Sequence, residues 1–197
     1  MKEEQSLVTR ARRGDETAFA LLVEQYQDRV YRLALRMCGN SHDAEEAAQE
    51  AFLAAWRGLP AFRGESRFSS WLYQLTSNAA IDLLRREKRH RGNVPIDEQI
   101  LPLSEDTPQL SAENAEMRER LQKALMTLSP EHREIFLLRQ MQQLSYEEIG
   151  EMLNLESGTV KSRLNRAKKQ LRQNLLQQGN ILPFPSVKGN EEGQSDV

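Results

Sequence analysis

The sequence predicts an all-α protein built from two small helical domains joined by a flexible linker. Apolar residues recur at three- and four-residue spacing in two separate blocks. Aromatic residues make up 6% of the chain, and runs of β-branched residues are short. The stretch between the blocks, NVPIDEQILPLSEDTPQLS, carries prolines and acids without a sustained period. We therefore predict domains over residues 1–92 and 113–178, a linker over 93–112, and a disordered tail over 179–197.

Net charge and cysteine content limit the classes of function. The 197 residues carry a formal net charge of −2, so the total charge predicts neither DNA nor membrane binding and any electrostatic argument has to be local. A single cysteine, Cys38, excludes an internal disulfide framework. The first residues lack the apolar core of a signal peptide, and no stretch approaches the ~20 apolar residues that would span a bilayer. These features predict a cytoplasmic protein.

The first block contains three predicted helices. Residues 17–38 have apolar side chains at helical spacing, and GNSH ends that pattern. Asp43 and Glu46 have the spacing of a capping box at the start of the next helix, which stops near Gly58 and Pro60. Residues 61–68 form a predicted loop around Gly64. A longer helix over 69–89 ends in a cluster of cations.

The second block ends in a helix-turn-helix pattern. Ser129-Pro130 is a helix-start signal, and Ser145 with Glu148 forms a capping box before a short helix. NLESG is a turn, after which Ser157 or Thr159 can cap a second helix.

That second helix has two different faces at about 100° per residue. Val160, Leu164, Ala167 and Leu171 fall on one apolar stripe, and polar and cationic residues lie opposite. The pattern predicts a recognition helix that enters the major groove, where arginine and asparagine can bind base edges and the other cations bind phosphate. A solvated basic helix face is the alternative. The candidate DNA-contacting residues are Lys161, Ser162, Arg163, Asn165, Arg166 and Lys169.

The first block offers a second candidate nucleic-acid surface. Aromatic and cationic residues alternate in the loop and the following helix, a combination that suits single-stranded DNA because bases stack on rings while phosphates follow positive charge. A base removed from a duplex also needs a polar pocket for its edge. Alternatively, Phe68 and Trp71 are core residues and the run RREKRHR is a solvated helix end. The candidates are Phe62, Arg63, Gly64, Ser66, Arg67, Phe68, Trp71, Asn78, Arg85 and Arg86.

The helix before this loop is acidic on one side. Asp43, Glu46, Gln49 and Glu50 are candidates for meeting a basic partner surface. An ordinary solvated amphipathic helix would show the same pattern.

Three stretches follow one another in a diagnostic order: DAEEAAQEAFLAAW, then FRGESRFSSWLYQLTSNAAIDLLRR, then LSPEHREIFLLRQMQQLSYEEIGEMLNLESGTVKSRLNRAKKQL. Together they resemble the extracytoplasmic-function, or group IV, sigma factors, which are small specificity subunits of bacterial RNA polymerase in the sigma-70 family. The resemblance extends to about residue 177.

The resemblance implies a role for each set of candidates. Residues 1–92 are similar to sigma region 2, in which the acidic helix docks on the β′ clamp helices of core RNA polymerase. The loop from Phe62 to Phe68 and the helix with Asn78 would recognise and melt the minus-ten element of promoter DNA. Residues 113–178 are similar to region 4, which would read the minus-thirty-five element and contact the β flap. Family members commonly serve a stress regulon and are held inactive by an anti-sigma factor, often one bound to the membrane.

Two other classes of function compete with this interpretation. A stand-alone helix-turn-helix regulator would bind DNA as a dimer. An enzyme is disfavoured because the three histidines are scattered and no P-loop, GxSxG or zinc-ligand spacing occurs. The sequence therefore predicts no catalytic residues, no metal and no cofactor.

Overall fold

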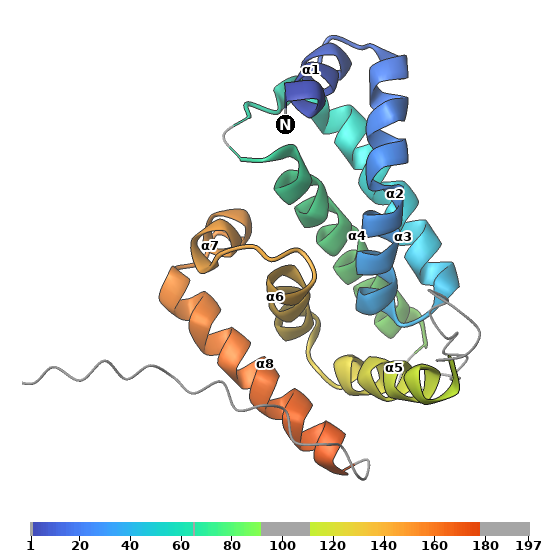
Figure 1. Ribbon diagram of the computed structural model, residues 1–197, viewed down its shortest axis with the longest axis vertical. Coiled ribbons are helices and arrows are strands. Elements are labelled where there is room, and N and C mark those ends of the chain that lie inside the picture. The colour runs from blue at the N-terminus through green and yellow to red at the C-terminus, as the bar shows by residue number, and fades with distance from the viewer. Residues whose placement is uncertain (1, 65, 92–110, 178–197) are drawn as a thin grey trace, which may run out of the picture.

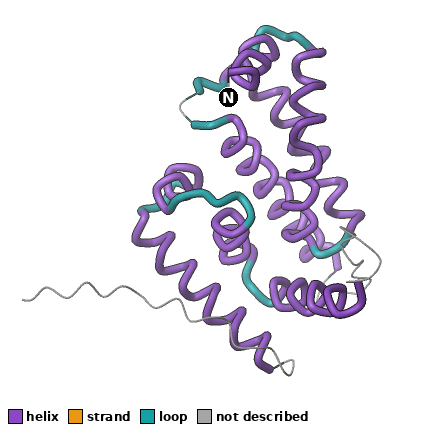
Figure 2. The backbone as a smooth tube through the Cα atoms, viewed as in Figure 1, coloured by secondary structure: helices purple, strands orange, loops and turns teal. Residues whose placement is uncertain are grey.

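The computed structural model describes residues 2–64, 66–91 and 111–177, and these residues form helices without any strand (Figures 1 and 2). The all-α prediction is confirmed. The predicted linker and tail lie almost entirely outside the described residues. The elements are α1 Lys2–Ala11, α2 Glu16–Cys38, α3 Ser41–Gly58, the 3-10 turn η1 Leu59–Ala61, α4 Phe68–Arg91, α5 Ser111–Met126, α6 Pro130–Gln140, α7 Tyr146–Leu153 and α8 Ser157–Gln177.

The first unit packs α2, α3 and α4 side by side, with α1 across one end of α2 (Figure 1). Helix α3 turns a stripe of alanines inward, and all four are fully buried. Small side chains at this spacing let the backbone of α3 approach both α2 and α4 closely. The other two helices supply larger buried residues such as Leu22, Leu33 and Leu72. The alanines are Ala44, Ala47, Ala51 and Ala55.

The helix ends in this unit confirm one prediction and correct another. Helix α2 begins as expected, and Asp15 Oδ1 accepts a hydrogen bond from Ala18 N at 3.0 Å. It ends at Gly39, whose φ of 90° is left-handed and favours glycine. The predicted Asp43–Glu46 capping box is wrong, because Asn40 caps α3 by accepting from Asp43 N at 2.9 Å. Helix α1 was not predicted.

The second unit contains the helix-turn-helix. Ser129 caps α6 by accepting from His132 N, with Pro130 at the first helical position as predicted. The capping box of α7 is also confirmed: Ser145 Oγ accepts from Glu148 N at 3.0 Å, and Glu148 accepts from Ser145 N at 2.8 Å. The predicted cap of α8 at Ser157 or Thr159 is wrong, since α8 begins at Ser157 and both residues lie inside it.

The two units are in contact through a buried arginine. Arg133 of α6 is 3% exposed and donates to the carbonyls of Leu125, Met126 and Leu128 at 3.0–3.1 Å, which ties together the end of α5 and the start of α6. It also donates to the carbonyl of Met37 near the end of α2. Burial lowers the pKa of Arg133 to about 10, so the guanidinium stays charged at neutral pH. One cation thus neutralises the negative ends of two helix dipoles.

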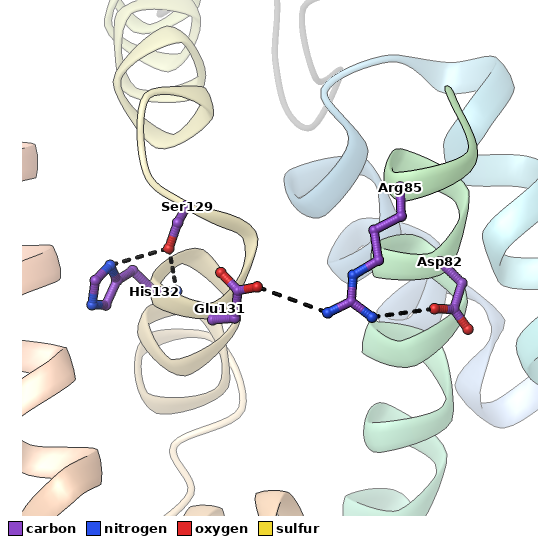
Figure 3. Close-up of polar contacts among 5 residues, drawn as sticks. All are labelled: Asp82, Arg85, Ser129, Glu131 and His132. Carbon is purple, nitrogen blue, oxygen red and sulfur yellow. Dashed lines mark hydrogen bonds and ion pairs between the residues drawn. The ribbon is translucent and has the colours of Figure 1, made fainter. Parts of the chain in front are cut away.

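Three further contacts join the units. Gln122 of α5 is 4% exposed, accepts from Arg36 Nη1 at 3.2 Å and points its own N–H at the last carbonyls of α2. Gln74 of α4 donates to the carbonyl of Met152 in α7. Arg85 of α4 pairs with Glu131 of α6 at 3.9 Å (Figure 3). The second unit therefore packs along α4 and against the end of α2.

Candidate nucleic-acid interface

Helix α8 has the two faces that the sequence predicts. Val160, Leu164 and Ala167 are fully buried, and Leu171 is 6% exposed, so the apolar stripe packs against the unit. The opposite face is solvent-exposed and carries cations beside polar side chains. The structure gathers five of the six candidates on it, namely Lys161, Ser162, Asn165, Arg166 and Lys169, while Arg163 is half-buried at its edge.

The turn before α8 fixes how this face is presented. Asn154 ends α7 with a left-handed φ of 53°, and Leu155 N donates to the carbonyl of Gly150 at 2.8 Å. A Cβ atom at Gly150 would lie 2.6 Å from the carbonyl oxygen of Leu155, so the close turn requires glycine here. At the other end, Gln170 of α8 donates to the carbonyl of Thr127 at 2.9 Å.

The aromatic candidates of the first unit form one cluster. The rings of Phe62 and Trp71 stack with centroids 4.8 Å apart and planes 28° apart, and both side chains are half-buried. Phe68 lies beneath them, 4% exposed, with its ring 5.5 Å from that of Tyr26. Phe68 is therefore a core residue, as the alternative interpretation of the sequence predicts. Phe62 and Trp71 keep part of their surface open.

The loop residues lie around an open hollow of about 850 Å³. Gly64 of this loop has a left-handed φ of 76°, a conformation that favours glycine. Arg63, Ser66 and Arg67 are exposed beside it. Trp71 lines the hollow from α4, and acidic side chains of α7 line its far side. The hollow thus lies between the two units, and its residues include Gly64, Ser66, Arg67, Trp71, Glu148 and Glu151.

The remaining candidates on α4 are exposed and partly paired. Asn78 is exposed on the same helix as Trp71. Arg85 lies 3.6 Å from Asp82 and 3.9 Å from Glu131 of the other unit (Figure 3). Arg86 pairs with Glu46 of α3 at 3.0 Å. Arg85 and Arg86 therefore form ion pairs with acidic side chains, and a DNA phosphate would have to replace those acids.

Three of the four candidates on α3 form an exposed stripe. Glu46, Gln49 and Glu50 are exposed, but Asp43 is 4% exposed and accepts from Asn40 Nδ2 at 2.7 Å. The stripe continues to Leu53, which is 49% exposed. Beside it lies an apolar hollow of about 550 Å³, which sequence reasoning missed although Gln49, Phe52, Leu53 and Trp56 recur at three- and four-residue spacing. Its lining residues include Phe19, Gln49, Phe52, Leu53 and Trp56.

The described parts of the chain hold neither a cluster of metal-ligating side chains nor a membrane-spanning helix. No group of three or more His, Cys, Asp or Glu side chains there could hold a metal ion. None of the helices described is long and apolar enough to cross a lipid bilayer.

The fold and these faces define a two-domain, all-helical protein with a cationic helix-turn-helix. Residues 22–90 match the family model of Sigma-70 region 2, and residues 118–171 match that of Sigma-70, region 4. The chain belongs to the extracytoplasmic-function RNA polymerase sigma factors.

Two relatives agree with that assignment, and a solved structure shares the fold. The chain is 34% identical over 176 residues to the ECF RNA polymerase sigma factor SigW of Bacillus subtilis, covering 85% of this chain and 94% of that one. It is 39% identical over 163 residues to the ECF sigma factor SigE of Mycolicibacterium smegmatis, covering 81% and 63%. The sigma factor RpoE of Bartonella quintana, solved with the anti-sigma factor NepR, shares the fold with a TM-score of 0.66 at 23% identity, covering 82% of this chain and 98% of that one. These findings support a sigma factor rather than a stand-alone dimeric regulator.

Proposed function

We propose that each of the two units recognises a different element of the promoter. Residues 1–92 bind core RNA polymerase and recognise and melt the minus-ten element, and residues 113–178 read the minus-thirty-five element. Residues 93–112 connect them, and residues 179–197 have no assigned role. The observation that carries this proposal is the pair of separate exposed surfaces, the cationic face of α8 and the aromatic-cationic loop before α4, on the two matched regions.

The minus-thirty-five element is read by the exposed face of α8. Arg166 and Asn165 can form paired hydrogen bonds to guanine and adenine edges in the major groove. The neighbouring cations hold the helix on phosphate and add affinity without sequence choice. The proposed set is Lys161, Ser162, Arg163, Asn165, Arg166 and Lys169.

The minus-ten element is captured by the loop and α4. A base pulled from the stack packs on the open surfaces of Phe62 and Trp71, and polar loop groups bind its edge. Phe68 supports the cluster from below and does not itself touch DNA. Asn78, Arg85 and Arg86 continue the surface along α4, together with Arg63, Gly64, Ser66 and Arg67 of the loop.

Core polymerase is bound by the acidic stripe of α3. Glu46, Gln49 and Glu50 meet the β′ clamp helices, and the apolar hollow beside Leu53 adds a non-polar part to the same interface. Asp43 contributes by fixing the first turn of α3 through Asn40. The second unit meets the β flap.

An anti-sigma factor is the proposed negative regulator. The Bartonella sigma factor was crystallised in complex with an anti-sigma factor, which supports a partner of this kind for the present chain. Membrane-bound anti-sigma factors are common in the family. Because polymerase and promoter DNA are cytoplasmic, we place the action of this protein in the cytoplasm.

The test is reconstitution with bacterial core RNA polymerase and run-off transcription from a randomised promoter library. We expect enriched sequences with two conserved blocks, one near minus ten and one near minus thirty-five. A chain that does not associate with core polymerase, or that binds a palindrome tightly as a dimer without polymerase, contradicts the proposal. Glu46→Lys with Glu50→Lys should abolish association, whereas Glu24→Lys on the exposed face of α2 should not.

A further inference from the structure

Met126 of α5 packs on the end of α2, where the two units meet. Gly39 ends α2 with a left-handed φ of 90°, and a Cβ atom at that position would lie 2.8 Å from Met126 Sδ and 3.0 Å from its Cε. The thioether therefore lies directly on the Gly39 backbone, in space that the side chain of any other residue would need. Met126 is only partly buried, so small molecules in solvent have access to this contact.

The backbone groups that α2 presents at this junction are hydrogen-bond acceptors. Nε2 of Gln122, one turn before the methionine, lies 3.5 Å and 3.4 Å from the carbonyl oxygens of Leu35 and Arg36. Arg133 donates to the carbonyl of Met37. These carbonyls form the negative end of the α2 dipole. The junction thus suits donors and apolar groups from the second unit, and a further acceptor there would be repelled.

Oxidation would turn Met126 into such an acceptor. Hydrogen peroxide transfers one oxygen to a thioether: a sulfur lone pair forms the S–O bond, the O–O bond breaks, and the rest of the peroxide leaves as water. The sulfur is oxidised by two electrons to a sulfoxide, which is polar and larger by one oxygen. Beside Gly39 that oxygen overfills a tight contact, and its partial negative charge lies near the carbonyls of α2.

We propose that Met126 is a methionine oxidation site whose sulfoxide releases the packing between the two units. Met117 lies on the same helix and is 45% exposed, so exposure alone does not single out Met126; its contact with Gly39 does. The change is reversible, because a methionine sulfoxide reductase returns the thioether while the oxygen leaves as water and a dithiol becomes a disulfide. Met126 thus couples peroxide to the arrangement of the chain.

The consequence for transcription rests on the proposed function. That function places the two units on separate promoter elements, so loss of the packing enlarges the fraction of the chain that can bind both. Oxidation of Met126 would then favour the promoter-binding form. The oxidation and the separation of the units are themselves independent of polymerase.

The test treats the full chain with enough hydrogen peroxide to convert Met117 completely. Mass spectrometry gives the sulfoxide content of each methionine, and small-angle scattering gives the radius of gyration. Oxidation should lower the equilibrium constant for packing on the order of tenfold, the effect of overfilling one tight contact, and so raise the radius. Methionine sulfoxide reductase with a dithiol should restore it. Gln74→Ala lacks one hydrogen bond between the units and should show a larger rise.

Two leucine variants assign the change to one sulfur. Met126→Leu keeps an apolar side chain of similar volume, and its radius should not respond to peroxide. Met117→Leu is the matched control and should respond like the parent. Each chain is compared with itself before treatment, so any effect of leucine on the packing cancels.

Three results would overturn the inference. An equal rise in Met126→Leu would assign the change to other oxidised groups. No rise in the parent or in Gln74→Ala, with Met126 fully converted, would show that the sulfoxide fits the packed form. A Met126 that remains a thioether while Met117 is converted would not be an oxidation site.

Association with core polymerase, measured on the same samples, keeps this inference apart from the proposed function. If the oxidised chain expands and neither form associates with core polymerase, the proposed function is wrong and the oxidation site stands. If the parent associates and directs transcription but its radius does not respond to peroxide, the oxidation site is wrong and the proposed function stands.

Discussion

At the scale of single residues, the exposed face of α8 holds two kinds of cation with different expected roles. Arg166 sits beside Asn165 opposite the buried stripe, where a fork of donors can address a guanine edge. Lys169, one turn later, carries a compact charge that suits a phosphate. Arg166→Ala should therefore weaken promoter binding by about 1–3 kcal/mol and relax base preference at one position, and Lys169→Ala should weaken all sequences alike.

Selection from a randomised minus-thirty-five library measures both effects at once. Lys169→Ala serves as the matched comparison, because it removes one charge from the same face. If the sequence enriched with Arg166→Ala is identical to that of the parent at every position, Arg166 does not read a base.

At the scale of elements, the turn between α7 and α8 depends on the absence of one methyl group. A Cβ at Gly150 would lie 2.6 Å from the carbonyl oxygen of Leu155, which belongs to backbone and cannot swing aside. Gly150→Ala should thus destabilise the second unit by about 1–3 kcal/mol, despite the better helix propensity of alanine, and weaken DNA binding through α8.

Gly158→Ala is the control for this prediction. It lies in the first turn of α8, and a Cβ there meets nothing within 4 Å. The substitution should leave stability unchanged or raise it slightly, by up to ~1 kcal/mol. Thermal unfolding of the two variants compares them directly, and equal stability would refute the requirement for glycine at position 150.

The elements also show how far local sequence signals reach. Capping boxes and apolar stripes act within a few residues, which is why the cap at Ser145 and the buried face of α8 were predicted correctly. The start of α3 was not predicted correctly, because Asn40 and Asp43 are both good capping residues. The choice between them depends on the left-handed turn at Gly39. The contacts of Arg133 with the carbonyls of Leu125 and Met37 were missed because they exist only where distant segments pack together.

At the scale of the whole molecule, the contacts between the units cannot coexist with the proposed promoter contacts. Elements named minus ten and minus thirty-five lie about 25 base pairs apart, or about 85 Å along a straight duplex. A chain of the length of residues 92–110 reaches up to ~65 Å when extended, which together with the breadth of the units permits that span. The packed arrangement does not permit that span, because the hydrogen bond from Gln74 to the carbonyl of Met152 holds α4 of the first unit against α7 of the second. The proposed promoter contacts therefore require the units to separate.

Weakening the contacts between the units should favour the separated state. Gln122 and Gln74 each bond across the contact, and Gln122 is 4% exposed. Gln74→Ala with Gln122→Ala should raise the radius of gyration measured by small-angle scattering. Gln25→Ala with Gln27→Ala, two exposed sites on α2, is the matched control and should leave it unchanged. An unchanged radius in both pairs would mean that these glutamines do not hold the units together.

Glu134 makes the packing between the two units sensitive to pH. It lies on α6, 5% exposed, and burial raises its pKa to about 7, while the Ser77 hydroxyl of α4 lowers it less. Glu131 of α6 also raises the pKa, and Arg163 of α8 and Arg85 of α4 lower it. An acid whose pKa is raised by packing binds more protons in the packed state, so packing weakens as pH rises from the ordinary value of 4.5 through about 7.

The packed arrangement should therefore loosen between about pH 5 and pH 7.5, with a rising radius of gyration. Glu134→Gln keeps the shape of the side chain without its titration, so its radius should stay at the low-pH value across that range. Any change of the radius with pH that persists in Glu134→Gln comes from groups other than this carboxyl. Identical pH profiles for the parent and Glu134→Gln would remove this carboxyl as the cause.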